Sequence, residues 1–301
     1  MVSVVGDTGT MTTAIRQGHI RANGLDFAFL EAGQGPLLLL LHGYPDNAWT
    51  WEHQIPALAE AGYRVVAPFL RGYPPSEIPV GGYYDRATLA LDVKGLIEGL
   101  NDGQPCDLVA QDWGAALSYG TLAAFPELVH RAVLMAIPHP TVVARSLASP
   151  VQIHRAFHWW FFQLPNLPEQ MVPADDFAFI DYLWELWSPG HREQAHVARI
   201  KQTLAQPGAV TATTNYYRAA LNPALQDPAL GDLRARLDGP IPVPTLALCG
   251  ADDVRAEPMA DQAGQFTGPY RFDVVPDCGH FLHRERPDDI NRRILAWLKD
   301  A

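Results

Sequence analysis

The sequence predicts an α/β fold: a mostly parallel central sheet into which a helical cap is inserted. Short apolar runs alternate with segments of helix length, a pattern typical of parallel strands covered by helices. Between Pro138 and about Leu230 the alternation stops, no strand pattern occurs, and aromatic residues become frequent. Because strand patterns resume after this stretch, we expect one domain. Residues 1–137 and 231–301 form its core, and residues 138–230 form the cap.

The strands and helices of the core follow from local patterns. Asn23-Gly24 favours a tight hairpin turn between strands at 19–22 and 25–31. Residues 36–41 include five consecutive leucines, which indicates a short central strand buried on both faces. The other expected elements are a helix at 51–61, a strand at 64–70, a helix at 86–100, a strand at 106–111, a helix at 114–125 and a strand at 130–137, then, after the cap, strands at 243–249 and 270–275 and a helix at 290–299.

The composition and the charge exclude several classes of protein. The 301 residues carry 22 Lys and Arg against 33 Asp and Glu, a formal net charge of −11. Charged residues make up only 18% of the chain, below the usual share of about 25%, so extensive disorder is not expected. The acidic balance argues against nucleic acid and against an anionic membrane as partners. The low charge indicates apolar surface in a pocket or an interface, and a homo-oligomer stays open.

The cysteines and the N-terminus favour a cytoplasmic protein. Cys106, Cys249 and Cys278 show no metal-ligand spacing, so we expect reduced thiols, no metal and no other cofactor. No window reaches the roughly 18 consecutive apolar residues of a membrane span. Residues 1–17 show no secretory signal pattern and are expected to be flexible.

The sharpest motif is the segment 110–114, Ala-Gln-Asp-Trp-Gly, between an expected strand and an expected helix. Its frame, small-x-nucleophile-x-small, is typical of a tight turn that exposes a nucleophile. Ser is the usual central residue, but here it is Asp112. A carboxylate at a helix N-terminus is favoured in its charged form and can attack an electrophilic carbon. An ordinary helix N-cap is the alternative interpretation of Asp112.

A second motif, His-Gly-Tyr-Pro at 42–45, follows the leucine strand. In a sheet of this kind the loop after that strand supplies half of an oxyanion hole, and the residue after the nucleophile supplies the other half. The backbone N–H groups of Tyr44 and Trp113 are therefore expected to converge on one oxygen.

An acid and a histidine follow the last two strands. The segment 250–253 ends in Asp253, and the segment 277–281 contains His280. Nucleophile, acid and histidine thus occur in the order Asp112, Asp253, His280. Each lies just after a strand, where open α/β sheets place their active sites.

Together these motifs resemble the α/β-hydrolase fold family, in the branch with an aspartate nucleophile that holds epoxide hydrolases and haloalkane and haloacetate dehalogenases. The resemblance extends from about Gly18 to the C-terminus. It implies a covalent mechanism: Asp112 attacks carbon to form an ester, and His280, oriented by Asp253, activates the water that hydrolyses it. The family frame Gly-x-x-Asp selects Asp253 rather than Asp252 as the acid.

Two positions depart from the family pattern. Gln111 stands where a histidine is common before the nucleophile. Phe69 stands where an aspartate is common, which removes an expected ion-pair partner of Arg71. Neither change removes a residue of the expected triad.

An epoxide hydrolase also needs cap residues that donate a proton to the leaving oxygen. The resemblance assigns this role to Tyr217, with Tyr216 as the neighbouring alternative. It assigns a second donor to His158, seven residues before Pro165, and some bacterial epoxide hydrolases carry such a His/Tyr pair. A neutral imidazole N–H can polarise the oxygen. Packing in the cap core is the alternative interpretation of both residues.

Dehalogenation with the same triad is the alternative reaction. Haloacetate dehalogenases carry a His-Trp pair like His158-Trp159, but they place arginines where this chain has Trp113 and Ala116, so a substrate carboxylate would lack its clamp. Haloalkane dehalogenases usually place Asn or Glu where this chain has Tyr44. We therefore rank epoxide hydrolysis first, dehalogenation second and a non-catalytic ligand-binding protein third.

The expected partners are a small hydrophobic epoxide and water. The aromatic content of the cap indicates an apolar, aromatic-lined pocket between cap and sheet. The residues expected to line it are Trp159, His42, Pro45, His139 and Phe281.

Overall fold

The computed structural model describes residues 14–147 and 149–299, and in this part of the chain eight strands form one sheet. The strand order is β1-β2-β4-β3-β5-β6-β7-β8. β2 is antiparallel to β1 and β4, and all other neighbours are parallel, which confirms the expected mostly parallel sheet. The strands are β1 (Arg16–Ala22), β2 (Leu25–Ala32), β3 (Leu37–Leu41), β4 (Arg64–Pro68), β5 (Cys106–Gln111), β6 (Val129–Met135), β7 (Thr245–Gly250) and β8 (Tyr270–Val275).

Helices connect the strands and build the cap. None of the helices in the described ranges is long and apolar enough to cross a membrane. The α-helices are α1 (Gln54–Glu60), α2 (Arg86–Leu100), α3 (Trp113–Ala124), α4 (Pro140–Ser146), α5 (Pro150–Arg155), α6 (Phe157–Phe161), α7 (Leu167–Met171), α8 (Ala174–Trp187), α9 (Gln194–Leu204), α10 (Ala209–Leu221), α11 (Gly231–Arg236), α12 (Ala256–Ala260), α13 (Leu282–Glu285) and α14 (Pro287–Lys299). Short 3-10 helices lie at Ala48–Trp51, Pro126–Leu128, Pro223–Leu225, Pro228–Leu230 and Ala263–Gln265.

Local sequence explains where several elements begin and turn. Asn23 and Gly24 both have positive φ, 44° and 79°, as the tight hairpin between β1 and β2 requires. The five leucines of β3 are at most 2% exposed, so this strand is buried on both faces. Helix α2 begins after Asp85, whose carboxylate accepts hydrogen bonds from the Ala87 amide and the Thr88 hydroxyl.

Some element boundaries differ from the expected ones. The helix expected at 51–61 is divided into a 3-10 turn and the shorter α1. Helix α14 begins earlier than expected, at Pro287, because proline fits the first helical position and Asp288 and Asp289 favour the first turn. Of the stretch expected to be flexible, Arg16 and Gln17 pair with β2, and residues 1–13 lie outside the described ranges.

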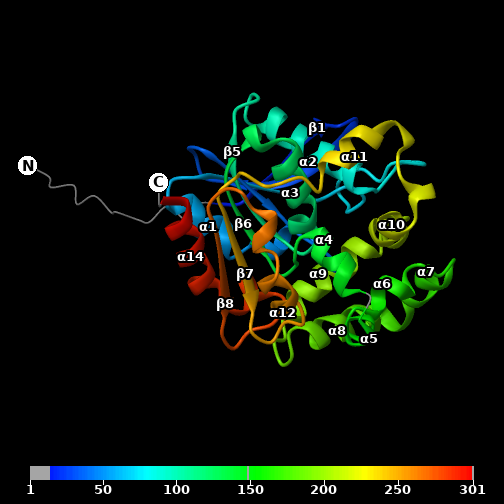
Figure 1. Ribbon diagram of the computed structural model, residues 1–301. Helices are drawn as coiled ribbons and strands as arrows, with labels where there is room; N and C mark the ends of the chain where they lie inside the picture. The colour runs from blue at the N-terminus through cyan, green and yellow to red at the C-terminus, as the bar shows by residue number, and fades with distance from the viewer. Residues whose placement is uncertain (1–13, 148, 300–301) are drawn as a thin grey trace, which may run out of the picture.

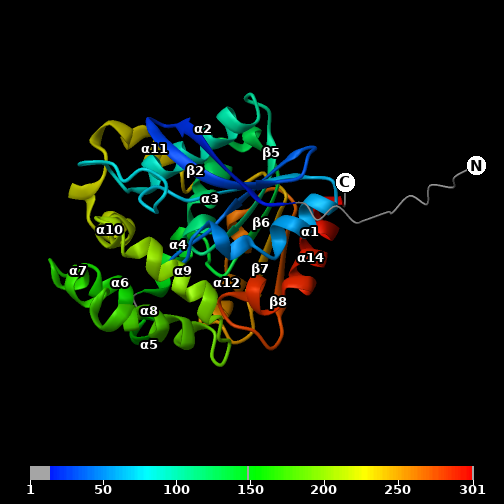
Figure 2. The ribbon, with the colours of Figure 1, turned by 180° about the vertical axis from the view of Figure 1, so that it is seen from behind.

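Helices cover both faces of the sheet (Figures 1 and 2). The views place α1 beside α14 on one face and α2 beside α3 on the other. Between β6 and β7 the described residues contain helices and no strand, and α5 to α8 gather at one side of the sheet. After α11 the chain is back in the core, where Leu237 packs on Ala87, Ala90 and Ala124. The cap boundaries at residues 138 and 230 remain predictions.

Candidate active site

The turn between β5 and α3 places Asp112 in a strained backbone conformation. Its φ is 51° and its ψ is −122°, a positive φ that residues other than glycine rarely adopt. Small neighbours permit this turn: a Cβ added to Gly114 would collide with the Leu41 carbonyl, and one added to Gly43 would collide with the Asp112 carboxylate. Asp112 makes no side-chain cap hydrogen bond to α3, so the ordinary N-cap interpretation does not describe it.

The Asp112 carboxylate is held in a fixed orientation. The backbone N–H of Tyr44 donates to Oδ1 at 2.8 Å. Trp113 is the first residue of α3, and the first amide groups of a helix have no intrahelical acceptor. Oδ2 lies 3.6 Å from Nε2 of His280. The two carboxylate oxygens therefore face different groups: an amide on one side and an imidazole on the other.

His280 is positioned by Asp253 from the opposite side of its ring. Nδ1 of His280 lies 2.8 Å from Oδ2 of Asp253, and both side chains are buried. Asp252 is exposed and makes no such contact, so the structure pairs Asp253 with the histidine. Burial alone would lower the pKa of His280, but the charges of Asp253 and Asp112 and the interaction of each carboxylate with the ring nitrogens raise it to about 9.

Tyr217 of α10 and His158 of α6 pack against each other beside the elbow. Their ring centroids are 5.4 Å apart. The Tyr217 ring lies 5.1 Å from the ring of Trp113 and 5.6 Å from that of Tyr44. Tyr216, in contrast, uses its hydroxyl to donate to the Arg71 carbonyl at 2.7 Å. The structure thus brings Tyr217 and His158 to the elbow and gives Tyr216 a structural bond.

Burial keeps a proton on each of these two side chains. It raises the pKa of Tyr217 well above 10, although the neighbouring positive charge of Arg255 opposes the rise. Burial also lowers the pKa of His158 well below 6.5, so the imidazole is neutral at physiological pH and retains one N–H. Nδ1 of His158 is buried and has no hydrogen-bond partner in the described part of the chain. Both groups are therefore available as donors.

The other predicted pocket residues surround the site in different ways. Trp159 stacks on Trp113 with ring centroids 5.5 Å apart. Phe281, which follows His280, stacks on Trp184 at 3.7 Å. The same Trp184 donates its indole N–H to the Pro45 carbonyl at 3.4 Å. Trp159 lines a cavity, whereas Phe281 and Pro45 pack against the cap.

His42 and His139 both bond backbone groups of loops. Nε2 of His42 accepts the Leu70 amide at 3.0 Å, so its proton lies on Nδ1 and is donated to the Gly43 carbonyl. Nδ1 of His139 accepts from the Thr141 amide and caps α4. Neither residue lines the cavity of about 130 Å³ beside the elbow, and their place in the substrate pocket stays a prediction.

A cavity of about 130 Å³ lies beside the elbow, between α3 and the cap. Trp113 and Ala116, the positions that hold a carboxylate clamp in the haloacetate comparison, both line it. The side chains of its wall are apolar apart from one arginine: Trp113, Ala116, Ile137, Pro140, Val143, Ala144, Leu147, Trp159, Ala220, Leu221 and Arg86. This cavity suits an apolar substituent.

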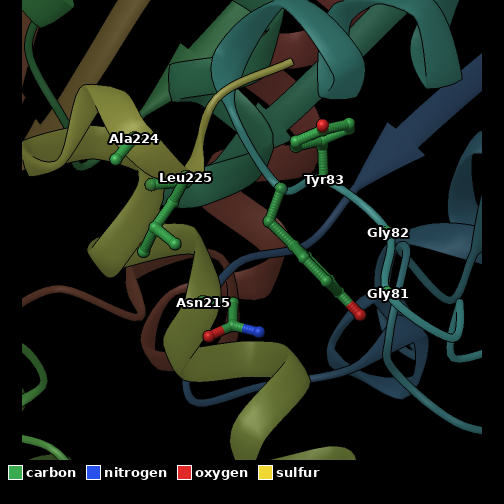
Figure 3. Close-up of a pocket in the computed structure, with 8 residues that line it drawn as sticks. Gly81, Gly82, Tyr83, Asn215, Ala224 and Leu225 are labelled. Carbon is green, nitrogen blue, oxygen red and sulfur yellow. The ribbon is translucent and has the colours of Figure 1, made fainter. Parts of the chain in front are cut away.

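A second cavity, of about 220 Å³, opens on the other side of α10 (Figure 3). Gly81, Gly82 and Tyr83 of the loop before α2 lie across from Asn215 and Leu225. No residue of the expected triad or of the donor pair lines it. The chemistry of the elbow therefore does not extend into this cavity.

Arg71 has a partner that the sequence pattern did not reveal. Its guanidinium forms two parallel hydrogen bonds of 2.6 Å with the carboxylate of Asp92 in α2. Both side chains are at most 6% exposed. Asn23 donates to the same carboxylate at 2.7 Å. The expected loss of an ion pair caused by Phe69 is therefore wrong, because α2 supplies the carboxylate instead.

The loop that carries His280 is tied to the end of α8. The His280 amide donates to the Trp187 carbonyl at 2.9 Å. Ser188 accepts from the Phe281 amide and donates to Glu285, whose carboxylate also accepts from the Gly279 amide. These bonds join the histidine loop to the cap. No sequence motif pointed to them, because each partner is an ordinary polar residue far away in the chain.

Gln111 provides a further contact to the same loop. Its amide donates to the His280 carbonyl at 3.3 Å, and its Oε1 is buried without a partner in the described ranges. Gln111, which stands where the family commonly has a histidine, thus links the end of β5 to the backbone of His280.

One group of described residues has metal-ligand spacing: Glu52, His53 and Glu193. The guanidinium of Arg284 bonds both carboxylates, so a cation already lies between them. These residues therefore do not fit a metal ion.

Four buried histidines predict that acid destabilises the fold. Burial lowers the pKa of His42 and His139 to about 4, that of His283 to about 3 and that of His158 well below 6.5. The unfolded chain binds protons at these residues below about pH 6.5, so the free energy of unfolding falls as the pH drops from 6.5 towards 4, by up to about 1.4 kcal/mol per pH unit for each histidine. His280 does not contribute in this window, because its raised pKa keeps it protonated in both states.

Urea unfolding at pH 7 and pH 5 measures this effect. In the His283→Gln variant we expect a smaller loss between the two pH values, because one of the buried neutral imidazoles is gone. An unchanged free energy of unfolding for the parent protein between pH 7 and 5 would contradict the assignment.

The sheet order, the strained elbow and the His–Asp pair at the ends of the strands are those of an α/β hydrolase. A model of the alpha/beta hydrolase family matches residues 38–293, and the chain belongs to this family. Epoxide hydrolase 4 of Mus musculus is 30% identical over 294 residues, which covers 94% of this chain and 79% of that protein. Epoxide hydrolase A of Mycobacterium tuberculosis is 28% identical over 312 residues, with 93% and 96% covered. A mutant epoxide hydrolase from Vigna radiata, a solved structure, has a TM-score of 0.80 at 26% identity, with 95% and 99% covered.

Proposed function

We propose that this protein is an epoxide hydrolase that converts a hydrophobic epoxide to a vicinal diol through an ester on Asp112. The observation that carries the proposal is the orientation of the Asp112 carboxylate. Its Oδ1 is bound by the Tyr44 amide, and its Oδ2 lies beside His280. The contacts of Tyr217 with Trp113 and with His158 support these two residues as the donors for the ring oxygen. The relatives named epoxide hydrolase support the same reaction.

In the first half of the reaction, the Asp112 carboxylate attacks one ring carbon. A C–O ester bond forms, the bond from that carbon to the ring oxygen breaks, and the oxygen takes the bonding electron pair. Tyr217 donates its proton to this oxygen, and the N–H of His158 polarises it. The pair works without a metal or another cofactor, because the strain of the three-membered ring drives the opening once the oxygen is protonated.

In the second half, His280 removes a proton from water, and the resulting hydroxide attacks the carbonyl carbon of the ester. Oδ1 becomes the oxyanion, and the Tyr44 and Trp113 amides form the hole that stabilises it. The intermediate collapses by breaking the bond from carbon to the diol oxygen, which takes a proton from His280. The carboxylic acid that remains on Asp112 returns a proton to the imidazole. The proton that His280 released when the ester formed replaces the one that Tyr217 gave to the ring oxygen, so the cycle is closed.

Formation of the ester itself prepares His280 to act as a base. In the free protein the charges of Asp253 and Asp112 keep the pKa of His280 at about 9, so the imidazole is protonated at neutral pH. Alkylation of Asp112 removes one of these charges. The pKa of His280 then falls, and the neutral imidazole needed for water activation becomes populated only when there is an ester to hydrolyse.

A single turnover in ¹⁸O-labelled water tests the covalent path. With enzyme in excess over styrene oxide, the first diol is expected to contain the unlabelled oxygen of Asp112, and the label is expected on Asp112, as read by mass spectrometry of both. Direct incorporation of the solvent label into the first diol would rule out the ester.

Two other functions are tested by parallel assays. Haloacetate and haloalkane dehalogenation share the Asp–His–Asp set, but Trp113 and Ala116 line an apolar cavity, which does not favour a carboxylate clamp. Release of halide from fluoroacetate or a bromoalkane, without diol formation from epoxides, would favour dehalogenation. Ligand binding with no turnover of either class would favour a non-catalytic protein.

We further propose that the protein acts in the cytoplasm on a small hydrophobic epoxide and water, and that neither nucleic acid nor a membrane is a partner. The three cysteines are all buried and free, which supports a reducing compartment. Whether the protein is a homo-oligomer is answered by its molecular mass in solution.

The Tyr217→Phe variant is expected to lose alkylation rate. The phenyl ring preserves the aromatic packing but removes the proton donor, and general acid catalysis contributes roughly 10²–10⁴-fold. Stopped-flow fluorescence of Trp113 and its neighbours during ester formation measures the step. Tyr216→Phe is the matched control, because its hydroxyl bonds only the Arg71 carbonyl. An equal loss in both variants would assign the effect to packing.

A further inference from the structure

Arg255 is a buried arginine without a carboxylate partner. In the described part of the chain three arginines are at most 5% exposed: Arg71, Arg255 and Arg284. Arg71 pairs with Asp92, and Arg284 pairs with Glu52 and Glu193. No carboxylate among residues 14–147 and 149–299 forms an ion pair with the Arg255 guanidinium, and its Nη1 is buried without an acceptor. A buried, unpaired guanidinium is costly, so an arginine kept in this state indicates an anion that is absent from the free protein.

Arg255 lies beside the candidate active site. It follows the acid of the triad by two residues, and its amide donates to Oδ1 of Asp253 at 2.9 Å. After burial, the charge of Arg255 is the largest influence on the pKa of His158, and it also lowers that of Tyr217. Arg255 is thus joined through its backbone to the acid of the triad, and its buried guanidinium carries the positive charge nearest in sequence to that acid.

One other buried nitrogen, Nδ1 of His158, also lacks a hydrogen-bond partner in the described ranges, whereas Nε2 of His280 faces Oδ2 of Asp112 at 3.6 Å. The Trp187 ring lies between these residues, 4.9 Å from the ring of His158 and 5.1 Å from that of His280. Unpartnered nitrogens of two side chains, Arg255 and His158, thus occur on α6 and on the segment after β7. Such a cluster is suited to oxygen atoms of a bound ligand.

Another part of the site is mostly apolar. The Tyr217 ring contacts both Trp113 and Trp159, and these two indoles border the cavity of about 130 Å³, whose one charged residue is Arg86. A ligand whose reactive carbon reaches Asp112 beside Tyr217 would therefore have both the cation Arg255 and a mostly apolar cavity available for its two substituents.

We propose that Arg255 binds a carboxylate of the substrate, so that the protein acts on epoxy acids that carry the carboxylate on one ring carbon and an apolar substituent on the other. The proposal rests on the proposed epoxide hydrolase function. Arg255 forms charge-assisted hydrogen bonds with the carboxylate, and the apolar substituent enters the cavity lined by Trp113 and Trp159.

The test compares trans-3-phenylglycidate with trans-β-methylstyrene oxide, in which a methyl group replaces the carboxylate. A charge-assisted bond in a buried site favours the acid by about 10- to 100-fold in kcat/KM. In Arg255→Met this preference is expected to disappear, because kcat/KM for the acid falls by a larger factor than kcat/KM for the neutral epoxide. Arg255→Lys is expected to restore part of the preference. Arg155→Met, which removes an exposed arginine of the cap, is expected to retain all of it.

Other outcomes overturn the proposal. A wild-type protein that prefers the neutral epoxide contradicts it. An equal fall for both epoxides in Arg255→Met, with unchanged thermal unfolding, would instead assign Arg255 to stabilisation of the opening ring oxygen. If neither epoxide is hydrolysed, the proposed function fails, and calorimetry with phenylacetate decides the anion site separately. Binding that is lost in Arg255→Met supports the site, and absent or unchanged binding overturns it.

Discussion

Replacing His280 with glutamine is expected to stop the reaction after the first chemical step. The Asp112 carboxylate would still attack the epoxide, because Tyr44 holds it in place independently of the imidazole. Water would no longer be activated, and loss of the histidine of a catalytic triad lowers turnover by roughly 10⁴-fold or more. The ester is expected to accumulate, and the intact mass of the protein rises by the mass of one epoxide.

The position of the added mass provides the control. The double variant Asp112→Asn/His280→Gln lacks the nucleophile and is expected to gain no mass under the same conditions. Peptide mapping of the single variant is expected to place the adduct on Asp112. An adduct on another residue, or a single variant that turns over like the parent protein, would contradict the assigned roles.

The Asp92→Asn variant is expected to lose a large part of its stability. The substitution leaves the Arg71 guanidinium buried without its carboxylate, and breaking one partner of a buried ion pair typically costs about 3–5 kcal/mol. The free energy of unfolding, from urea denaturation at pH 7, measures the loss. Glu98→Gln, which breaks an ion pair with Lys94 that is partly exposed, is expected to cost less than about 1 kcal/mol.

A second variant separates the lost charge pair from lost packing. In Arg71→Met/Asp92→Leu both charges are replaced by apolar side chains, so no unpaired charge remains, and the protein is expected to be more stable than Asp92→Asn. A double variant that is less stable than the single variant would show that the shape of the pair, and not its charge, supports this region.

Much of the core could be predicted from local sequence because its signals are local. The ranges of β5, α2 and β8 agree with the expected ones, since each is bounded by a cap or turn residue within the pattern itself. The helix expected at 51–61 was too long, because apolar periodicity continues across a 3-10 turn whose hydrogen bonds no pattern of side chains reveals. Helix α14 begins at Pro287 because proline and two aspartates favour a first turn that has little apolar periodicity.

The elbow and the histidine pair were predictable because each motif lies at a strand end. Parallel strands bring such ends to one edge of the sheet. Asp112, Asp253 and His280 therefore meet, although Asp253 follows Asp112 by 141 residues and His280 follows Asp253 by 27. The choice of Tyr217 over Tyr216 is supported by the bond from Tyr216 to the Arg71 carbonyl. His42 and His139 could not be assigned in advance, because their hydrogen bonds depend on the path of two loops.

Other contacts had no signal in the sequence. The partner of Arg71 lies on the face of a helix 21 residues later, a position that no spacing rule selects. The lack of an ion pair at Arg255 is even harder to predict, because it depends on the positions of all the surrounding carboxylates. One signal in the sequence was its position, because an arginine two residues after the acid of a triad is close to the active site along the chain.

The bonds between the histidine loop and the end of α8 have a consequence for engineering. The His280 amide donates to the Trp187 carbonyl, and Ser188 donates to Glu285. The loop that carries the base is therefore attached directly to the end of cap helix α8. A cap transplanted from a relative to change the substrate range would lack these hydrogen-bond partners. The loop that carries His280 would then be displaced. An exchange that retains residues 187–193 of this chain and replaces only the helices before and after them would keep the two parts in register.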